Sequence, residues 1–219
     1  MLHPTLSLAQ CEIEGSPSGF LNRLFNNQFK TQTVERLGDE LIQLIVAGGY
    51  PAALHRTSST RRAAWYRDYL DTIVQRNVRD LASPFQVSRP TIKEYVSLLT
   101  RVFLLNELPP WHNNRLSRLV KTPKLHMGDT GTCCSLLGIN AADLKADRTL
   151  LGQLLETFIF HKIKRHANWH DQPLTLSHYR DRDGVEVDIV IEKGTRAVAG
   201  IEIKASASDN TKDFRGLKN

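Results

Sequence analysis

Two short phrases near the C-terminal end of the 219-residue chain contain the residue types that can hold a divalent cation. They are Glu186-Val187-Asp188 and Glu202-Ile203-Lys204, separated by one expected hairpin. On paired strands, Asp188 and Glu202 would lie close enough to share one ion. Carboxylate oxygens are hard ligands that suit Mg²⁺ or Mn²⁺. Such an ion can polarise a phosphoryl group and help to form an attacking hydroxide.

Three further residues could complete this site. Lys204 shares a strand face with Gly200 and Glu202, because side chains alternate with a period of two. Its ammonium group could hold the attacking water or stabilise developing negative charge. Gly200 would leave room for a backbone to approach. Glu156, on the helix expected before the strands, could supply a third carboxylate. We therefore predict Glu156, Asp188 and Glu202 as metal ligands and, together with Lys204, as the catalytic set.

The same residues have an ordinary alternative interpretation. The exposed faces of amphipathic strands often carry glutamate and lysine, and the pattern Glu-x-Lys is frequent by chance. Glu186 is better explained as a neighbour of the site than as a ligand. His161, His166 and His170 do not form a convincing metal set. At this stage a cation site and a solvated strand face both remain open.

The strands that would position the acidic residues are indicated by a change of apolar period after residue 174. Residues 174–180 form one expected strand, and Asp183-Gly184 is a strong two-residue hairpin signal. Apolar residues alternate over 185–191, and a third strand is expected at 197–205. These segments predict a three-stranded meander.

Upstream of the strands the sequence is mainly helical, since apolar residues recur at intervals of three and four. Helices are expected at Phe20–Phe25, 34–47, 59–81, 88–105 and about 150–167. The segment 111–126 is basic and loop-like, and residues 128–131 form a turn. Helices followed by a helix and a small sheet indicate an α+β or α/β fold class.

Composition limits the functional classes. The chain has 29 Lys and Arg against 23 Asp and Glu, so its formal net charge is +6. This charge is compatible with nucleic-acid binding but too small to establish it. Cys11, Cys133 and Cys134 show no disulfide or metal-ligand spacing, which favours a reducing cytoplasm. No apolar run is long enough for a membrane span, and no secretory signal is recognisable. A cytoplasmic location without a membrane partner is expected.

Four phrases, in this order, resemble the C-terminal half of prokaryotic AAA-type ATPases, a region known as domain of unknown function 4143. They are Gly48-Gly49-Tyr50-Pro51, Lys121-Thr122-Pro123-Lys124-Leu125 with Asp129-Thr130-Gly131, Gly152-Gln153-Leu154-Leu155-Glu156, and Tyr179-Arg180 leading into the two acidic phrases. Glu156, Asp188 and Glu202-Ile203-Lys204 also look like the signature of PD-(D/E)xK nucleases. The resemblance implies Glu156, Asp188, Glu202 and Lys204 as the nuclease-like positions.

The resemblance implies three regions. Residues 1–82 would be a helical lid-like region of the AAA type, and residues 83–128 a partial winged helix. Residues 129–219 would be a restriction-endonuclease-like domain, a helix with a mixed β-sheet, which is C-terminally incomplete relative to the family. No G-x-x-x-x-G-K-[ST] phosphate loop occurs in the sequence, so no nucleotide-binding residues are expected. ATP would be bound only in a full-length relative, by an ATPase module acting in cis or in trans.

Three functions follow from these observations. The first is a metal-dependent, nuclease-like module that acts on DNA. The second is a non-catalytic DNA-binding or regulatory remnant of an ATPase, in which basic residues contact phosphates. The residues expected to contact DNA are Arg89, Lys93, Arg115, Arg118, Lys121 and Lys124. The third is an inactive gene fragment.

Overall fold

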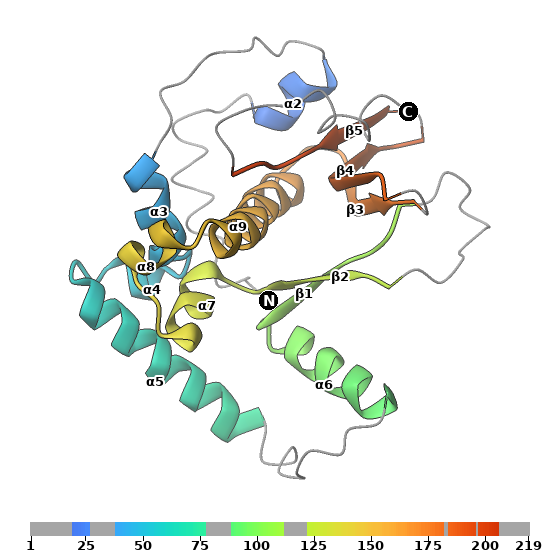
Figure 1. The fold of residues 1–219 in the computed structure, drawn as a ribbon. Coiled ribbons are helices and arrows are strands. Elements are labelled where there is room, and N and C mark those ends of the chain that lie inside the picture. Colours follow the sequence, from blue (N-terminus) through green and yellow to red (C-terminus); the bar gives the residue numbers. More distant parts are fainter. Residues whose placement is uncertain are drawn as a thin grey trace.

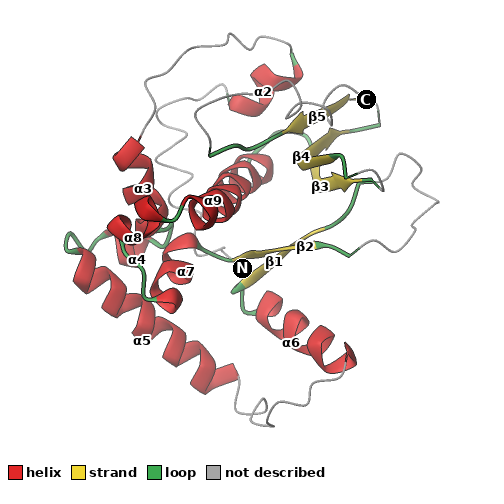
Figure 2. Cartoon of the chain, in the orientation of Figure 1, coloured by secondary structure: helices red, strands yellow, loops and turns green. Residues whose placement is uncertain are grey.

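The chain folds into helices and two small antiparallel sheets, shown in Figures 1 and 2, so the α+β class is confirmed. The computed structural model describes residues 19–26, 38–77, 89–111, 122–181, 184–195 and 197–205, except for the side chains of residues 74–77 and 89–92.

Eight helices lie in this described part of the chain. They are α2 (Phe20–Phe25), α3 (Gly38–Ala47), α4 (Pro51–Leu54), α5 (Ser59–Asn77), α6 (Arg89–Arg101), α7 (Thr130–Leu137), α8 (Ala141–Ala146) and α9 (Arg148–Asn168). Helices α2, α3, α5 and α9 confirm four expected helices over the residues described. None of the described helices is long and apolar enough to cross a membrane.

Two short helices depart from the sequence interpretation because side-chain caps create them. The turn expected at 128–131 is instead the start of α7, since the Asp129 carboxylate accepts a hydrogen bond from the Thr132 N–H. Helix α8 was not expected at all. It begins at a capping box, in which Asn140 and Asp143 each bond the other's backbone.

The described strands are β1 (Leu105–Leu108), β2 (Lys124–Met127), β3 (Leu174–Arg180), β4 (Glu186–Lys193) and β5 (Ala197–Ile201). Antiparallel pairing in the order β3-β4-β5 confirms the expected meander. The third strand ends at Ile201, earlier than expected. The mixed sheet is a correction, because the described strands pair antiparallel and only Pro110 and His178 form a parallel bridge.

The sheet β1-β2 was missed by the sequence interpretation. The helix expected over 88–105 ends at Arg101, and Phe103 takes a positive φ of 63° where the chain turns into β1. Strand β2 lies inside the segment that was expected to be a basic loop. Each strand has only four residues, which is too short for apolar alternation to stand out.

Helix α9 occupies the centre of the fold, between the sheet β3-β4-β5 and helices α3, α7 and α8 (Figure 1). Its first half packs against those helices, and its second half packs against the sheet. The first core contains Ile42, Ile45, Cys134, Leu144, Leu151, Leu154, Leu155 and Phe158. The second contains Leu21, Leu108, Phe160, Ile163, Ala167, Ile189 and Ile191. A helix that is apolar on most of its circumference must be buried in this way.

A buried carboxylate links the Gly48-Gly49 turn to the start of α7. Asp129 accepts hydrogen bonds from the Gly49 N–H and, at 2.9 Å, from the Thr132 N–H. Burial raises the pKa of this carboxyl group, although the backbone hydrogen bonds act in the opposite direction. The Tyr66 hydroxyl donates to the Ala47 carbonyl at 2.9 Å, beside the same turn. Two of the phrases on which the family resemblance rests, Gly48-Gly49 and Asp129-Thr130-Gly131, are therefore in direct contact.

We predict that Gly48→Ala destabilises the protein by roughly 3 kcal/mol or more. Gly48 has φ +71°, and a Cβ there would collide with the Tyr66 hydroxyl and the Asp129 carboxylate and lie 2.8 Å from the Gly131 nitrogen. Gly138→Ala is the matched control. Its φ is +67° with open space around it, so only backbone strain of about 1 kcal/mol is expected. Denaturant unfolding of both variants measures the difference, and equal losses would contradict the packing argument.

Candidate functional site

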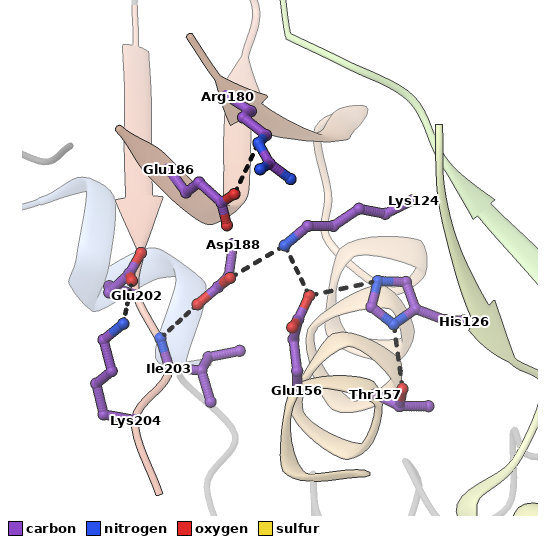
Figure 3. A network of polar contacts seen from close by, with 10 residues as sticks. All are labelled: Lys124, His126, Glu156, Thr157, Arg180, Glu186, Asp188, Glu202, Ile203 and Lys204. Atoms are coloured by element: carbon purple, nitrogen blue, oxygen red, sulfur yellow. Dashed lines mark hydrogen bonds and ion pairs between the residues drawn. The ribbon is translucent and has the colours of Figure 1, made fainter. Parts of the chain in front are cut away.

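Two carboxylates from different elements converge on one ammonium group. The Nζ atom of Lys124 lies 2.9 Å from Glu156 Oε1 and 3.1 Å from Asp188 Oδ1, as Figure 3 shows. Glu156 comes from the middle of α9, Asp188 from β4 and Lys124 from the start of β2. The side chains are partly shielded, with exposed fractions of 26%, 11% and 25% respectively. This cluster, Lys124 with Glu156 and Asp188, is called the acid corner below.

Asp188 is held in a strand that is buried on both faces. Residues 187–191 of β4 are all buried, so the expected alternation of apolar and solvated positions does not occur there. The second carboxylate oxygen of Asp188 accepts a hydrogen bond from the Ile203 N–H at 2.9 Å. A solvated strand face therefore does not describe Asp188. Its carboxylate is oriented by the backbone just after β5 and by Lys124.

Glu202 and Lys204 lie beside the acid corner but pair with each other. Lys204 Nζ is 2.7 Å from Glu202 Oε1. The Glu202 side chain is only 7% exposed, whereas that of Lys204 is 40% exposed. Burial and the charge of Asp188 raise the pKa of Glu202, while Lys204 acts in the opposite direction. The other carboxylate oxygen of Glu202 is buried with no hydrogen-bond partner among the described residues.

His126 forms the inner wall of the acid corner. Its Nδ1 atom lies 3.2 Å from Thr157 Oγ1, and its ring stacks on Phe160 with 4.4 Å between centroids. The Nε2 atom is 3.9 Å from Glu156 Oε1. Burial and the positive charge of Lys124 lower the pKa of His126 to about 4. His126 is therefore neutral at neutral pH and adds no charge to the corner.

Lys124 stays charged in this setting. Burial disfavours its ammonium form, but the hydrogen bonds and charges of Glu156 and Asp188 outweigh burial and raise its pKa above the usual value. Sequence reasoning assigned Lys124 to DNA contacts and overlooked His126. The available signal was their spacing of two residues before the Gly128-Asp129 turn, which on a strand places both side chains on one face.

The other predicted site residues lie elsewhere. Glu186 pairs with Arg180 on the neighbouring strand at 2.9 Å, as suits a neighbour of the site. Lys93 is exposed on α6. Arg115, Arg118 and Lys121 and the side chain of Arg89 lie outside the described residues.

The chemical type of the donors fits a hard divalent cation, but their arrangement fits only in part. Glu156 and Asp188 already share one positive charge, and oxygen donors of this kind suit Mg²⁺ or Mn²⁺. Glu202 is turned toward Lys204 instead. Within the part of the chain that the structure describes, no group of three His, Cys, Asp or Glu residues is placed to hold one metal ion. The positive charge that lies between Glu156 and Asp188 is the ammonium group of Lys124.

Comparison with known proteins supports the resemblance to domain of unknown function 4143. Residues 151–219 match a domain of unknown function, DUF4143, and residues 38–84 and 77–143 match a second one, DUF8612. The uncharacterized proteins Mb2031c of Mycobacterium bovis and Rv2008c of Mycobacterium tuberculosis are each 24% identical to the chain over 195 residues. The match covers 76% of this chain but 43% of each relative, so the chain spans less than half of their length. No solved structure is significantly similar to the chain.

The buried histidines predict a loss of stability in mild acid. Burial lowers the pKa of His126 to about 4 and that of His161 to about 3, whereas both histidines have a pKa near 6.5 when unfolded. Between pH 6.5 and pH 4 the unfolded chain binds more protons, so the free energy of unfolding falls as the pH falls. The expected slope is about 1.4 kcal/mol per pH unit for each histidine.

Denaturant unfolding at several pH values between 4.5 and 7.5, on the order of half a unit apart, measures this slope. His126→Phe, which preserves the stacking surface on Phe160, should reduce the slope by the contribution of one histidine. A slope that remains the same in His126→Phe and His161→Phe would contradict this account.

Proposed function

We propose that Glu156, Asp188 and Glu202, together with Lys204, form the acidic site of a nuclease-like module that acts on DNA with Mg²⁺ or Mn²⁺. We also propose that the module belongs to the C-terminal half of an AAA-type ATPase, with the ATPase module supplied in cis or in trans. The observation that carries the proposal is the convergence of Glu156 and Asp188 on one cation. Two carboxylates from a central helix and a central strand are costly to bring together unless a positive charge lies between them. Lys124 supplies that charge here, and a divalent cation could supply it in the active form.

The residues of the proposed site have different roles. Glu156 and Asp188 would hold the divalent cation, and Glu202 would join them after leaving Lys204. Once bound, such an ion would polarise a phosphodiester and lower the pKa of a water molecule. The Ile203 N–H fixes the Asp188 carboxylate, as outer hydrogen bonds commonly fix ligands. Lys204, which is 40% exposed, is accessible to a phosphate oxygen or a water molecule. His126 remains neutral and does not repel a cation.

We predict metal-dependent nicking of supercoiled DNA that depends on the acidic residues. Asp188→Ala and Glu156→Ala should each lower the nicking rate by about 100-fold or more, because a carboxylate that holds the cation is lost. Lys204→Ala should also lower it strongly. Conversion of supercoiled plasmid to the open circle, with Mg²⁺, Mn²⁺ or EDTA, is the measurement.

Glu186→Ala is the matched control for nicking. Glu186 is an acid two residues from Asp188 on the same strand, but it pairs with Arg180. Its removal should leave the rate within about twofold, since no ligand is lost. Nicking that persists in both acid variants, or that needs no divalent ion, would refute the proposal.

A second candidate function is DNA binding without catalysis. It is favoured by the position of Lys124, because its ammonium group already pairs with both carboxylates of the acid corner without a metal ion. Lys93 on α6 is exposed and available to a phosphate. In this form the module would anchor or regulate an ATPase on DNA.

Binding of this kind should be salt-dependent, because phosphate contacts release counterions. We predict that Lys93→Ala weakens binding to duplex DNA and lowers the slope of log K against log[salt] by about one. Lys145→Ala is the control, since this exposed lysine on α8 pairs with Asp39 at 2.7 Å. Fluorescence anisotropy of a labelled duplex over a salt series tests both variants. Binding that is insensitive to salt would exclude this function.

A further inference from the structure

We infer that Lys124 is a resident cation of the acid corner, which competes with a divalent metal ion for Glu156 and Asp188. The inference deepens the proposed function, on which it rests, because the competing ion is the one that a nuclease-like site would use. It assigns to Lys124 a role that differs from a phosphate contact and from the role of Lys204.

The first argument is position. Oxygen atoms of Glu156 and Asp188 lie 2.9 Å and 3.1 Å from the same nitrogen atom of Lys124. A magnesium ion bound by the same two oxygens would lie about 2.1 Å from each. The ion and the ammonium group would then overlap. Only one of them can occupy the space between these carboxylates at a time.

The second argument is charge. The three acids Glu156, Asp188 and Glu202 face the two ammonium groups of Lys124 and Lys204, so the local charge is nearly balanced without any metal. A divalent ion added to the intact cluster would create an excess of positive charge in a partly buried site. That excess is unfavourable where the effective dielectric constant is low. Departure of Lys124 removes it.

The third argument is the contrast between the two lysines. Lys204 pairs with Glu202 and is 40% exposed, whereas the ammonium group between Glu156 and Asp188 is that of Lys124. Lys124 is less exposed and bonds both of those acids. A lysine has a flexible four-carbon stem, so its ammonium group can leave the carboxylates without a shift of β2. The second carboxylate oxygen of Glu202 is buried with no hydrogen-bond partner among the described residues, so this oxygen can bind the incoming ion.

Direct titration with Mn²⁺ tests the competition. Calorimetry on the whole chain should show that Lys124→Gln binds Mn²⁺ at least about tenfold more tightly than the original protein, which corresponds to about 1.4 kcal/mol. Lys145→Gln is the matched control and should leave the affinity within about twofold, because this exposed lysine pairs with Asp39 on another part of the surface. The gain should vanish in the double variant Lys124→Gln, Glu156→Gln. Equal Mn²⁺ affinity in Lys124→Gln and the original protein would overturn the inference.

A second measurement needs no variant and so does not depend on whether Lys124→Gln folds. The amine of Lys124 should be acetylated slowly by acetic anhydride while it is held by both carboxylates, and faster when Mg²⁺ displaces it. Peptide mass spectrometry reports this rate, with the exposed Lys93 as internal control. A Lys124 rate that does not respond to Mg²⁺ at concentrations that saturate calorimetric binding would refute the competition.

The outcomes distinguish this inference from the proposed function. Tighter Mn²⁺ binding by Lys124→Gln without DNA nicking in any variant would support the inference and count against a nuclease. Nicking by the original protein with no gain in Mn²⁺ affinity in Lys124→Gln would support the nuclease and overturn the inference. Failure of every variant to bind Mn²⁺ would overturn both.

Discussion

The fold depends on the burial of helix α9 on two sides. Apolar residues of its first half pack against α3, α7 and α8, and those of its second half pack against the strands. The remaining polar positions of α9 must then be satisfied by whichever element lies over them. Glu156 meets Lys124, Thr157 meets His126, and His161 meets the Met127 carbonyl. Strand β2 is therefore fixed along α9 by a series of polar contacts.

The pairing of charges in the acid corner also follows from burial. Asp188 lies in a strand with both faces covered, so its charge requires a partner close at hand. Asp188 has two such partners, the Lys124 ammonium group and the Ile203 N–H. A lysine held between two acids offsets their charges without a metal ion. Under the proposed function, the same contact would also keep the carboxylates in position for a divalent cation.

The tertiary contacts also bring together phrases that lie far apart in the sequence. Gly48-Gly49 and Asp129-Thr130-Gly131 meet at a buried carboxylate where a larger residue would not fit, so their role here is structural. Helix α3, from the region predicted as lid-like, shares a core with α9, from the region predicted as nuclease-like. The boundaries at residues 82 and 128 stay predictions, and within the described residues the two regions are packed together.

The sequence by itself determined the elements with strong periodicity. The long helices and the meander β3-β4-β5 followed from apolar spacing and from the Asp183-Gly184 hairpin signal. Local patterns also indicated Glu156, Asp188, Glu202 and Lys204 as residues of interest. Strands β1 and β2 were not predictable, because four residues are too few for a period to be recognised.

Only the tertiary structure decided which lysine forms an ion pair with which acid. Glu-x-Lys spacing placed Lys204 on the same strand face as Glu202, and Lys204 bonds Glu202. Lys124, which the sequence assigned to DNA contacts, instead bonds Glu156 and Asp188. Lys124 is 32 residues from Glu156 and 64 residues from Asp188 along the chain. A pairing over such separations is set by how β2 packs on α9, and the period of a local sequence pattern carries no information about that packing.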